Sequence, residues 1–144
     1  MTMNAPGLVS VRSRNTVKVT VDRLEASLKA KGITVFARID HAAGAAAAGM
    51  PLRPTELLIF GNPTSGTPLM QVEQTIGIDL PMKALVWEDA GGDVWIAYND
   101  PVWLAVRHGL RHDTADAVHA MAGVAVHGMV GALAKFAEVA AAGD

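Results

Sequence analysis

The chain has 144 residues, 51% of them hydrophobic and 18% charged, which allows one domain with a real core and argues against a disordered chain. A formal net charge of −2 gives no general attraction to nucleic acid or to an anionic membrane. The absence of cysteine excludes disulfides, thiol nucleophiles and thiolate metal sites, and it suits a reducing cytoplasm.

The beginning of the sequence lacks the continuous apolar block of a secretory signal. We therefore expect a cytoplasmic protein with a single domain over residues 1–144. Residues 1–15 are a candidate flexible N-terminus.

The first three predicted elements are a strand, a helix and a second strand. Weak alternation over Leu8 to Arg12 predicts the first strand, and helical spacing from Thr20, as the N-cap, to Gly32 predicts the helix. Strict alternation over Ile33 to Asp40 predicts a half-buried strand. Its two predicted faces are Ile33, Val35, Ala37 and Ile39 on one side and Phe36, Arg38 and Asp40 on the other.

The middle of the chain predicts a short helix, a strand and a second helix. The helix is expected over the alanine-rich stretch His41 to Gly49, and the apolar strand over Glu56 to Phe60. Asn62 to Gly66 reads as a loop. Thr67 is then expected to cap a helix that has Pro68 at its first position.

The clearest hairpin of the chain follows. Two strands, Met82 to Glu88 and Val94 to Tyr98, flank the turn residues Ala90-Gly91-Gly92. Asp100 is expected to cap a short helix that Gly109 ends.

A long amphipathic helix is predicted from Asp113 onward. Its uncharged run, Ala117 to Ala134, approaches the length of about 20 residues that a membrane span needs. The run is interrupted by histidine and glycine and is otherwise rich in alanine, so we read it as a soluble helix and expect no membrane partner. The complete order of elements predicts an α+β fold: a two-layer sandwich with a mixed or antiparallel sheet of about five strands and helices packed on it.

Three blocks of the sequence resemble, in order and spacing, one prokaryotic family, domain of unknown function 302. The blocks are Phe36 to His41, Arg53 to Pro63 and Gly66 to Gln71. The resemblance implies a compact α+β domain and a homodimer. The family offers no established catalytic residues to carry over, so the candidate site residues below come from the sequence pattern alone.

His41 and Glu56 are the candidates for acid–base chemistry. His41 lies beside Asp40, where a strand ends and a helix begins, so it is placed to act as a general acid or base or to bind an anion. The alternative is a histidine that caps the helix. Glu56 is a candidate base if it faces a cleft, but a salt bridge to Arg38 or Arg53 is the better interpretation.

Asn62, Thr67 and Gln71 are the candidates for binding a ligand or cofactor. The loop from Asn62 to Thr67 offers amides and hydroxyls at a helix N-terminus, where a phosphate or carboxylate is stabilised. A plain loop with a capping threonine explains the same residues. The sequence identifies no particular cofactor.

The remaining histidines and aromatics give weaker signals. His108, His112, His119 and His127 have spacings that only partly suit a metal, and we expect no metal site. Trp87, Trp95, Tyr98 and Trp103 are expected in the core or in a dimer interface. No lysine or arginine interleaves with these aromatics, so we expect no nucleic-acid partner.

Three classes of function remain open from the sequence. The preferred one is a domain that binds a small ligand, with an anion among the options, in a pocket near His41 built from the five candidate residues. The second is an acid–base enzyme that uses His41 and a carboxylate. The third is a structural or interaction module whose partner is a second copy of the chain.

Overall fold

The computed structural model describes residues 5–110 and 117–143. In chain order the elements are β1 (Leu8–Ser13), α1 (Val17–Ala30), β2 (Thr34–Asp40), α2 (His41–Ala47), β3 (Thr55–Gly61), α3 (Pro63–Val72), the 3-10 helix η1 (Gln74–Asp79), β4 (Met82–Glu88), β5 (Val94–Asn99), α4 (Pro101–Arg107) and α5 (Ala117–Ala141). The predicted start of the last helix at Asp113 lies outside the described residues.

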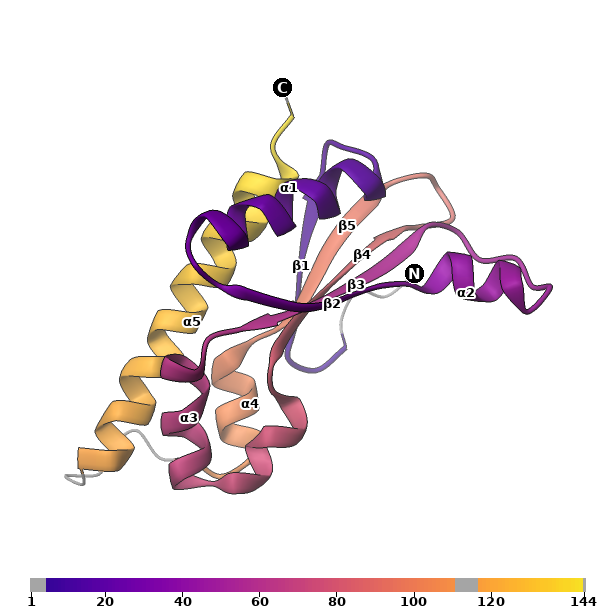
Figure 1. Cartoon of the computed structure of the whole chain (residues 1–144). Helices are drawn as coiled ribbons and strands as arrows, with labels where there is room; N and C mark the ends of the chain where they lie inside the picture. The colour runs from indigo at the N-terminus through magenta and orange to yellow at the C-terminus, as the bar shows by residue number, and fades with distance from the viewer. Residues whose placement is uncertain (1–4, 111–116, 144) are drawn as a thin grey trace.

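The strands form one sheet in the order β1-β5-β4-β3-β2, and every neighbouring pair is antiparallel. This confirms the predicted α+β class with a five-stranded sheet. Figure 1 shows α1 and α5 on one side of the sheet, α3 and α4 gathered at one end of it, and α2 projecting from it. The hairpin β4–β5 is the one predicted from the turn residues, with Trp87 paired to Trp95.

The main core lies between the sheet and the two helices that cover it. Alternate residues of the central strands, such as Leu58, Val86 and Ile96, are almost fully buried and pack with Val21 and Leu24 of α1. Burying one such side chain contributes roughly 1.5–3 kcal/mol. A second apolar cluster joins α3, η1, α4 and α5 at the end of the sheet; its buried members are Leu69, Ile76, Ala105, Leu110, Ala122 and Val126.

Helix α1 begins earlier than predicted. Thr16, not Thr20, is its N-cap, and the Thr16 side chain accepts a hydrogen bond from the backbone N–H of Val19. Thr20 is fully buried inside the helix, and its hydroxyl lies 2.7 Å from that of Ser13 on β1. A tertiary hydrogen bond therefore accounts for the threonine that resembled a cap.

A β-bulge at Phe36 changes the predicted faces of β2. Val35 is paired with Phe60 and Ala37 with Ile59, so Phe36 is an extra residue in the edge strand. Beyond the bulge the alternation is shifted, and Arg38 comes onto the side of the sheet that α1 covers. The prediction that Val35, Ala37 and Ile39 share one face is wrong because strict alternation does not survive an inserted residue.

Helix α3 also begins earlier than predicted. Asn62 is its N-cap and Pro63 its first residue, whereas Thr67 and Pro68 lie inside the helix. Both Asn62-Pro63 and Thr67-Pro68 match the pattern of a cap followed by proline, and the structure uses the first. The predicted cap of α4 is confirmed, because Asp100 accepts a hydrogen bond from the backbone N–H of Val102 at 2.9 Å.

Helix α5 is the longest helix among the described residues. Its segment Met121–Ala141 has a mean hydropathy of 1.4 and, by length and composition alone, is long and apolar enough to cross a membrane. In the fold it packs on α1, α3 and α4, with Val126 and Leu133 buried. Only 33% of this apolar segment is buried, and Met121 and Val124 are 59% and 73% exposed.

Candidate functional site

The structure does not bring the five predicted site residues together. In the β2–β3 pair, Asp40 lies opposite Glu56 at one end, and Thr34 lies opposite Gly61 at the other. His41 follows Asp40 and Asn62 follows Gly61, so His41 and Asn62 lie at opposite ends of these strands. A single pocket cannot contain them both.

His41 lies on the surface as the first residue of α2. The side chain of Asp40 caps this helix by accepting a hydrogen bond from the backbone N–H of Ala43 at 2.9 Å. None of the seven residues of α2 is buried. His41 therefore lacks the enclosure that usually accompanies acid–base catalysis.

Glu56 forms the salt bridge that was the preferred interpretation. It is 9% exposed, and its Oε1 accepts a hydrogen bond from Nε of Arg38 at 2.8 Å. The same guanidinium donates from Nη1 to Asp22 at 2.7 Å and to Glu25 at 3.2 Å, both on α1. The β-bulge makes this possible because it turns Arg38 toward α1.

The charges of this network stabilise one another. The hydrogen bond to Glu56 raises the pKa of Arg38 above its ordinary value, against the opposing effect of burial. The hydrogen bond from Arg38 lowers the pKa of Asp22, and those from Lys29 and then Arg38 lower the pKa of Glu25. The ion pair that Glu56 forms with Arg38 at 2.8 Å favours a structural role for Glu56 over that of a base.

The candidate ligand-binding residues are separated along α3, and all three are exposed. Oδ1 of Asn62 accepts the backbone N–H of Thr64, and the Asn62 carbonyl accepts those of Ser65 and Gly66. The first amides of the helix are therefore already paired, which removes the free donors expected for an anion cradle. Thr67 and Gln71 lie further along the helix.

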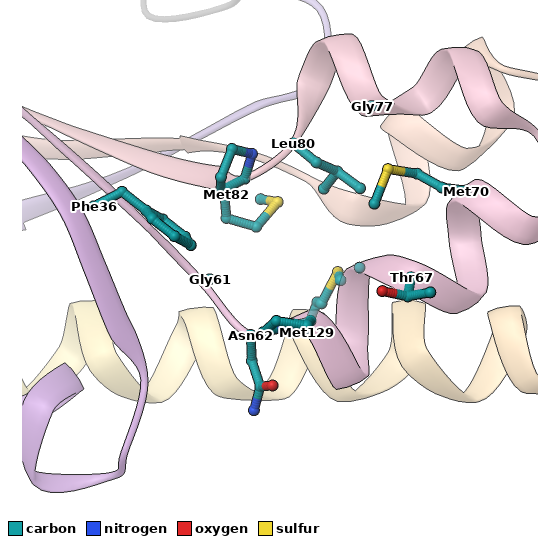
Figure 2. Close-up of a pocket in the computed structure, with 12 residues that line it drawn as sticks. Phe36, Gly61, Asn62, Thr67, Met70, Gly77, Leu80, Met82 and Met129 are labelled. Carbon is teal, nitrogen blue, oxygen red and sulfur yellow. The ribbon is translucent and has the colours of Figure 1, made fainter.

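Two of these residues, Asn62 and Thr67, border a cavity of about 240 Å³ between α3, η1 and α5 and the ends of β3 and β4. Figure 2 shows it from the side, with Phe36 at one end and Met70 at the other. The lining residues are Phe36, Gly61, Asn62, Pro63, Gly66, Thr67, Met70, Gly77, Leu80, Pro81, Met82 and Met129. None of these described lining residues is charged.

Phe36 and Gly77 shape this cavity in different ways. The bulge leaves the ring of Phe36 55% exposed at the cavity. A Cβ at Gly77 would lie 3.2 Å from Sδ of Met70, so glycine leaves room for that sulfur. Sequence reasoning missed the cavity because its walls come from segments up to 93 residues apart (Phe36 to Met129) and methionine usually signals core.

A second polar cluster connects η1 to the end of α4. Nε2 of His108 lies 2.6 Å from Oδ2 of Asp79, and Nδ1 lies 3.2 Å from the hydroxyl of Thr75. Arg107 also donates to Asp79, at 2.7 Å. Burial alone would raise the pKa of Asp79, but the hydrogen bonds from His108 and Arg107 lower it. The cluster holds η1, one wall of the cavity, against α4.

This cluster was not predicted, because His108 and Asp79 are separated by 29 residues. The sequence pattern groups His108 with His112, His119 and His127. Of these, His112 and the side chain of His119 lie outside the described residues. Among the residues that are described, no three histidine, aspartate or glutamate side chains are grouped as metal ligands.

Curated proteins named as fluoride channels match much of this chain. Fluoride-specific ion channel FluC 1 of Brucella suis biovar 1 (strain 1330) and FluC 2 of Brucella melitensis biotype 1 are each 55% identical to it over 115 residues, or 80% of the chain. The matches cover 45% and 43% of those proteins. The chain thus spans less than half the length of these curated relatives.

A solved structure shows the same fold. It is a crystal structure of an uncharacterized conserved protein DUF302 from Bacillus stearothermophilus, with a TM-score of 0.76 and 21% identity. The likeness covers 94% of this chain and 99% of that one. The family described as domain of unknown function DUF302 matches residues 9–127. Since this match includes most of the sheet and its helices, the chain belongs to the DUF302 family.

Proposed function

We propose that this domain binds a small, uncharged and largely apolar molecule in the cavity beside α3. The observation that carries the proposal is the lining: three methionines, Phe36 and Leu80 surround about 240 Å³ without a charged side chain. This volume is a little below the roughly 300–1,000 Å³ of sites for drug-sized ligands. The occupant is therefore a small molecule, and Asn62 and Thr67 supply polar groups at the rim.

The cavity also explains why a neutral ligand is favoured over an anionic one. An anion would need a cationic partner or unpaired amides, and the amides at the start of α3 are already bonded to Asn62. Flexible methionine side chains adapt to apolar ligands of different shapes, which is why they are common at permissive binding surfaces.

The proposal is tested by filling the cavity. A Cβ at Gly66 would meet Leu80 and Met70 at ordinary contact distances, so the side chain of Gly66→Leu would extend into the cavity. Binding of a neutral fluorescent dye such as Nile red is measured for the wild type and this variant. The matched control is Gly44→Leu, on helix α2, where an added Cβ meets nothing within 4 Å.

We expect Gly66→Leu to weaken dye binding by about tenfold, or about 1.4 kcal/mol, and Gly44→Leu to leave it unchanged. Equal binding by all three proteins would show that the dye binds elsewhere and would refute the proposed site. Circular dichroism establishes that the variants are folded.

A second candidate function is an accessory domain of a fluoride channel, and the curated relatives favour it. An open five-stranded sheet leaves backbone groups unpaired at both edges, so it does not itself span a bilayer. We propose that the channel activity named for those relatives belongs to the part that this chain does not match. We propose that the matched part, and this chain, act on such a channel from outside the bilayer.

The accessory role is tested by growth in graded concentrations of fluoride. A host that lacks this chain should become more or less sensitive to fluoride than its parent, and the chain supplied from a plasmid should restore the parental response. An unchanged response at every concentration would contradict this role without bearing on the cavity.

A further inference from the structure

Three methionines from separate elements line the same cavity. Met70 comes from the middle of α3, Met82 from the start of β4 and Met129 from α5. Figure 2 shows the three methionine side chains extending toward the pocket from different elements. The other described methionines, Met50 and Met121, are 60% and 59% exposed elsewhere.

The chemistry of this arrangement is that of a soft-metal site. Thioether sulfur is a soft, neutral ligand that favours Cu(I), whereas Mg²⁺ and Ca²⁺ require oxygen ligands. The chain has no cysteine, so no thiolate competes with the methionines. None of the described lining residues is charged, so no carboxylate competes with the sulfurs for a soft metal ion.

We propose that Met70, Met82 and Met129 bind one Cu(I) ion in this cavity. The inference rests on the cavity being a binding site, as in the proposed function, but it requires sulfur rather than apolar shape. Gly77 contributes by leaving the space that the Met70 sulfur occupies. Thioether ligands have no proton to lose, so Cu(I) binding at this site should not depend on pH. Binding at histidine or thiolate sites does depend on pH, because those ligands must be deprotonated.

The test is an anaerobic Cu(I) titration of the whole chain against a coloured chelator, with bicinchoninate as the competitor. The variants are Met70→Leu, Met82→Leu and Met129→Leu, singly and together. Leucine preserves volume and apolarity and removes only the sulfur. The matched control is Met121→Leu, which removes an exposed sulfur away from the cavity.

We expect the wild type and Met121→Leu to bind one equivalent, with sulfur as the metal's neighbour in X-ray absorption and the same affinity at pH 6 and pH 8. Each cavity substitution removes one of three soft ligands and should weaken binding by about tenfold or more. The triple variant should bind no Cu(I). If the triple variant does not fold, the single variants decide.

Three results would overturn the proposal: no binding by the wild type, equal binding by the cavity variants, or nitrogen as the principal neighbour of copper. Nile red binding is measured on the same variants. The triple leucine variant should retain it, because the apolar cavity remains. Loss of copper alone thus supports the sulfur site, whereas loss of dye binding in Gly66→Leu bears on the proposed function.

Discussion

Replacing Arg38 by methionine removes a guanidinium that contacts three carboxylates and leaves Glu56, 9% exposed, without its cation. Removing one partner of a fully buried ion pair costs about 3–5 kcal/mol. The side chain of Arg38 is 26% exposed and that of Asp22 is 47% exposed, so solvent screening reduces the expected cost to about 2 kcal/mol. For a chain of this size, that is a fall in Tm of about 6 °C.

The assay is urea unfolding, followed by tryptophan fluorescence, of the wild type, Arg38→Met, Glu56→Gln and the double variant. The double variant removes both charges of the Arg38–Glu56 pair, so it leaves no unpaired buried charge. We therefore expect it to be less destabilised than the sum of the two single variants, by a coupling free energy of about 1 kcal/mol. The control cycle uses Arg12 and Asp93, whose side chains are 64% and 43% exposed, and should give less than about 0.5 kcal/mol. A coupling below about 0.3 kcal/mol for Arg38 and Glu56 would refute the reasoning.

The same network predicts a pH dependence. The pKa values of Asp22 and Glu25 are lowered in the folded state from ordinary values of 3.8 and 4.5. Their stabilisation is therefore fully present above the ordinary values and is lost as the pH falls through the lower, folded-state values. We expect the cost of Arg38→Met to be smaller at about pH 3 than at about pH 6, and a cost that grows on acidification would contradict this sign.

Three further predictions concern other parts of the fold. Gly128 and Gly131 lie in α5, where an added Cβ meets nothing within 4 Å. Gly→Ala at either site should therefore raise the free energy of unfolding by up to about 1 kcal/mol, measured by thermal melts. A loss of stability would contradict this prediction. His108→Ala removes a hydrogen bond to Asp79 and should destabilise the domain by about 1–2 kcal/mol near neutral pH, an effect that fades below about pH 4 because the Asp79 pKa is lowered in the folded state; an undiminished effect at low pH would contradict this. If a second copy covers the half-buried sheet face that holds Leu85, wild type should sediment as a dimer and Leu85→Glu as a folded monomer, whereas a wild-type monomer would refute that homodimer.

The elements that sequence reasoning placed well are those fixed by local chemistry. The β4–β5 hairpin follows from alternating strands around Ala90-Gly91-Gly92, and the turn is closed by Asp89, which accepts the backbone N–H groups of Gly91 and Asp93. Helix α4 follows from Asp100 and Pro101 in the same way. In both cases the residues that define the element are its own neighbours in sequence.

The elements that it placed poorly depend on distant contacts. The sequence around Thr20 resembles that of a helix cap, but its hydroxyl forms a hydrogen bond with the hydroxyl of Ser13 on β1. Asn62 and Thr67 carry the same local signal, and nothing nearby in sequence decides between them. The period-two pattern of β2 alone cannot identify Phe36 as an inserted residue, because the insertion is defined by how β2 pairs with β3.

The candidate site shows the same limit. The family-like blocks indicate one pocket for His41, Glu56 and Asn62, but in the antiparallel β2–β3 pair His41 and Glu56 lie at one end and Asn62 lies at the other. The sulfurs of Met70, Met82 and Met129 are brought together only by the packing of α3 and α5 beside β4. The sequence thus predicted a polar pocket, whereas the structure has an apolar one.

The inserted Phe36 also bears on how the edge of this sheet meets other molecules. Strand β2 is the last strand of the sheet, so its outer side presents unpaired backbone groups to other chains. A regular edge strand can pair with the edge strand of a neighbouring molecule, so that the two sheets join edge to edge. A bulge bends the strand and interrupts this pairing. Deleting Phe36 would straighten the edge, and we expect it to turn a dispersed protein into one that assembles into fibrils.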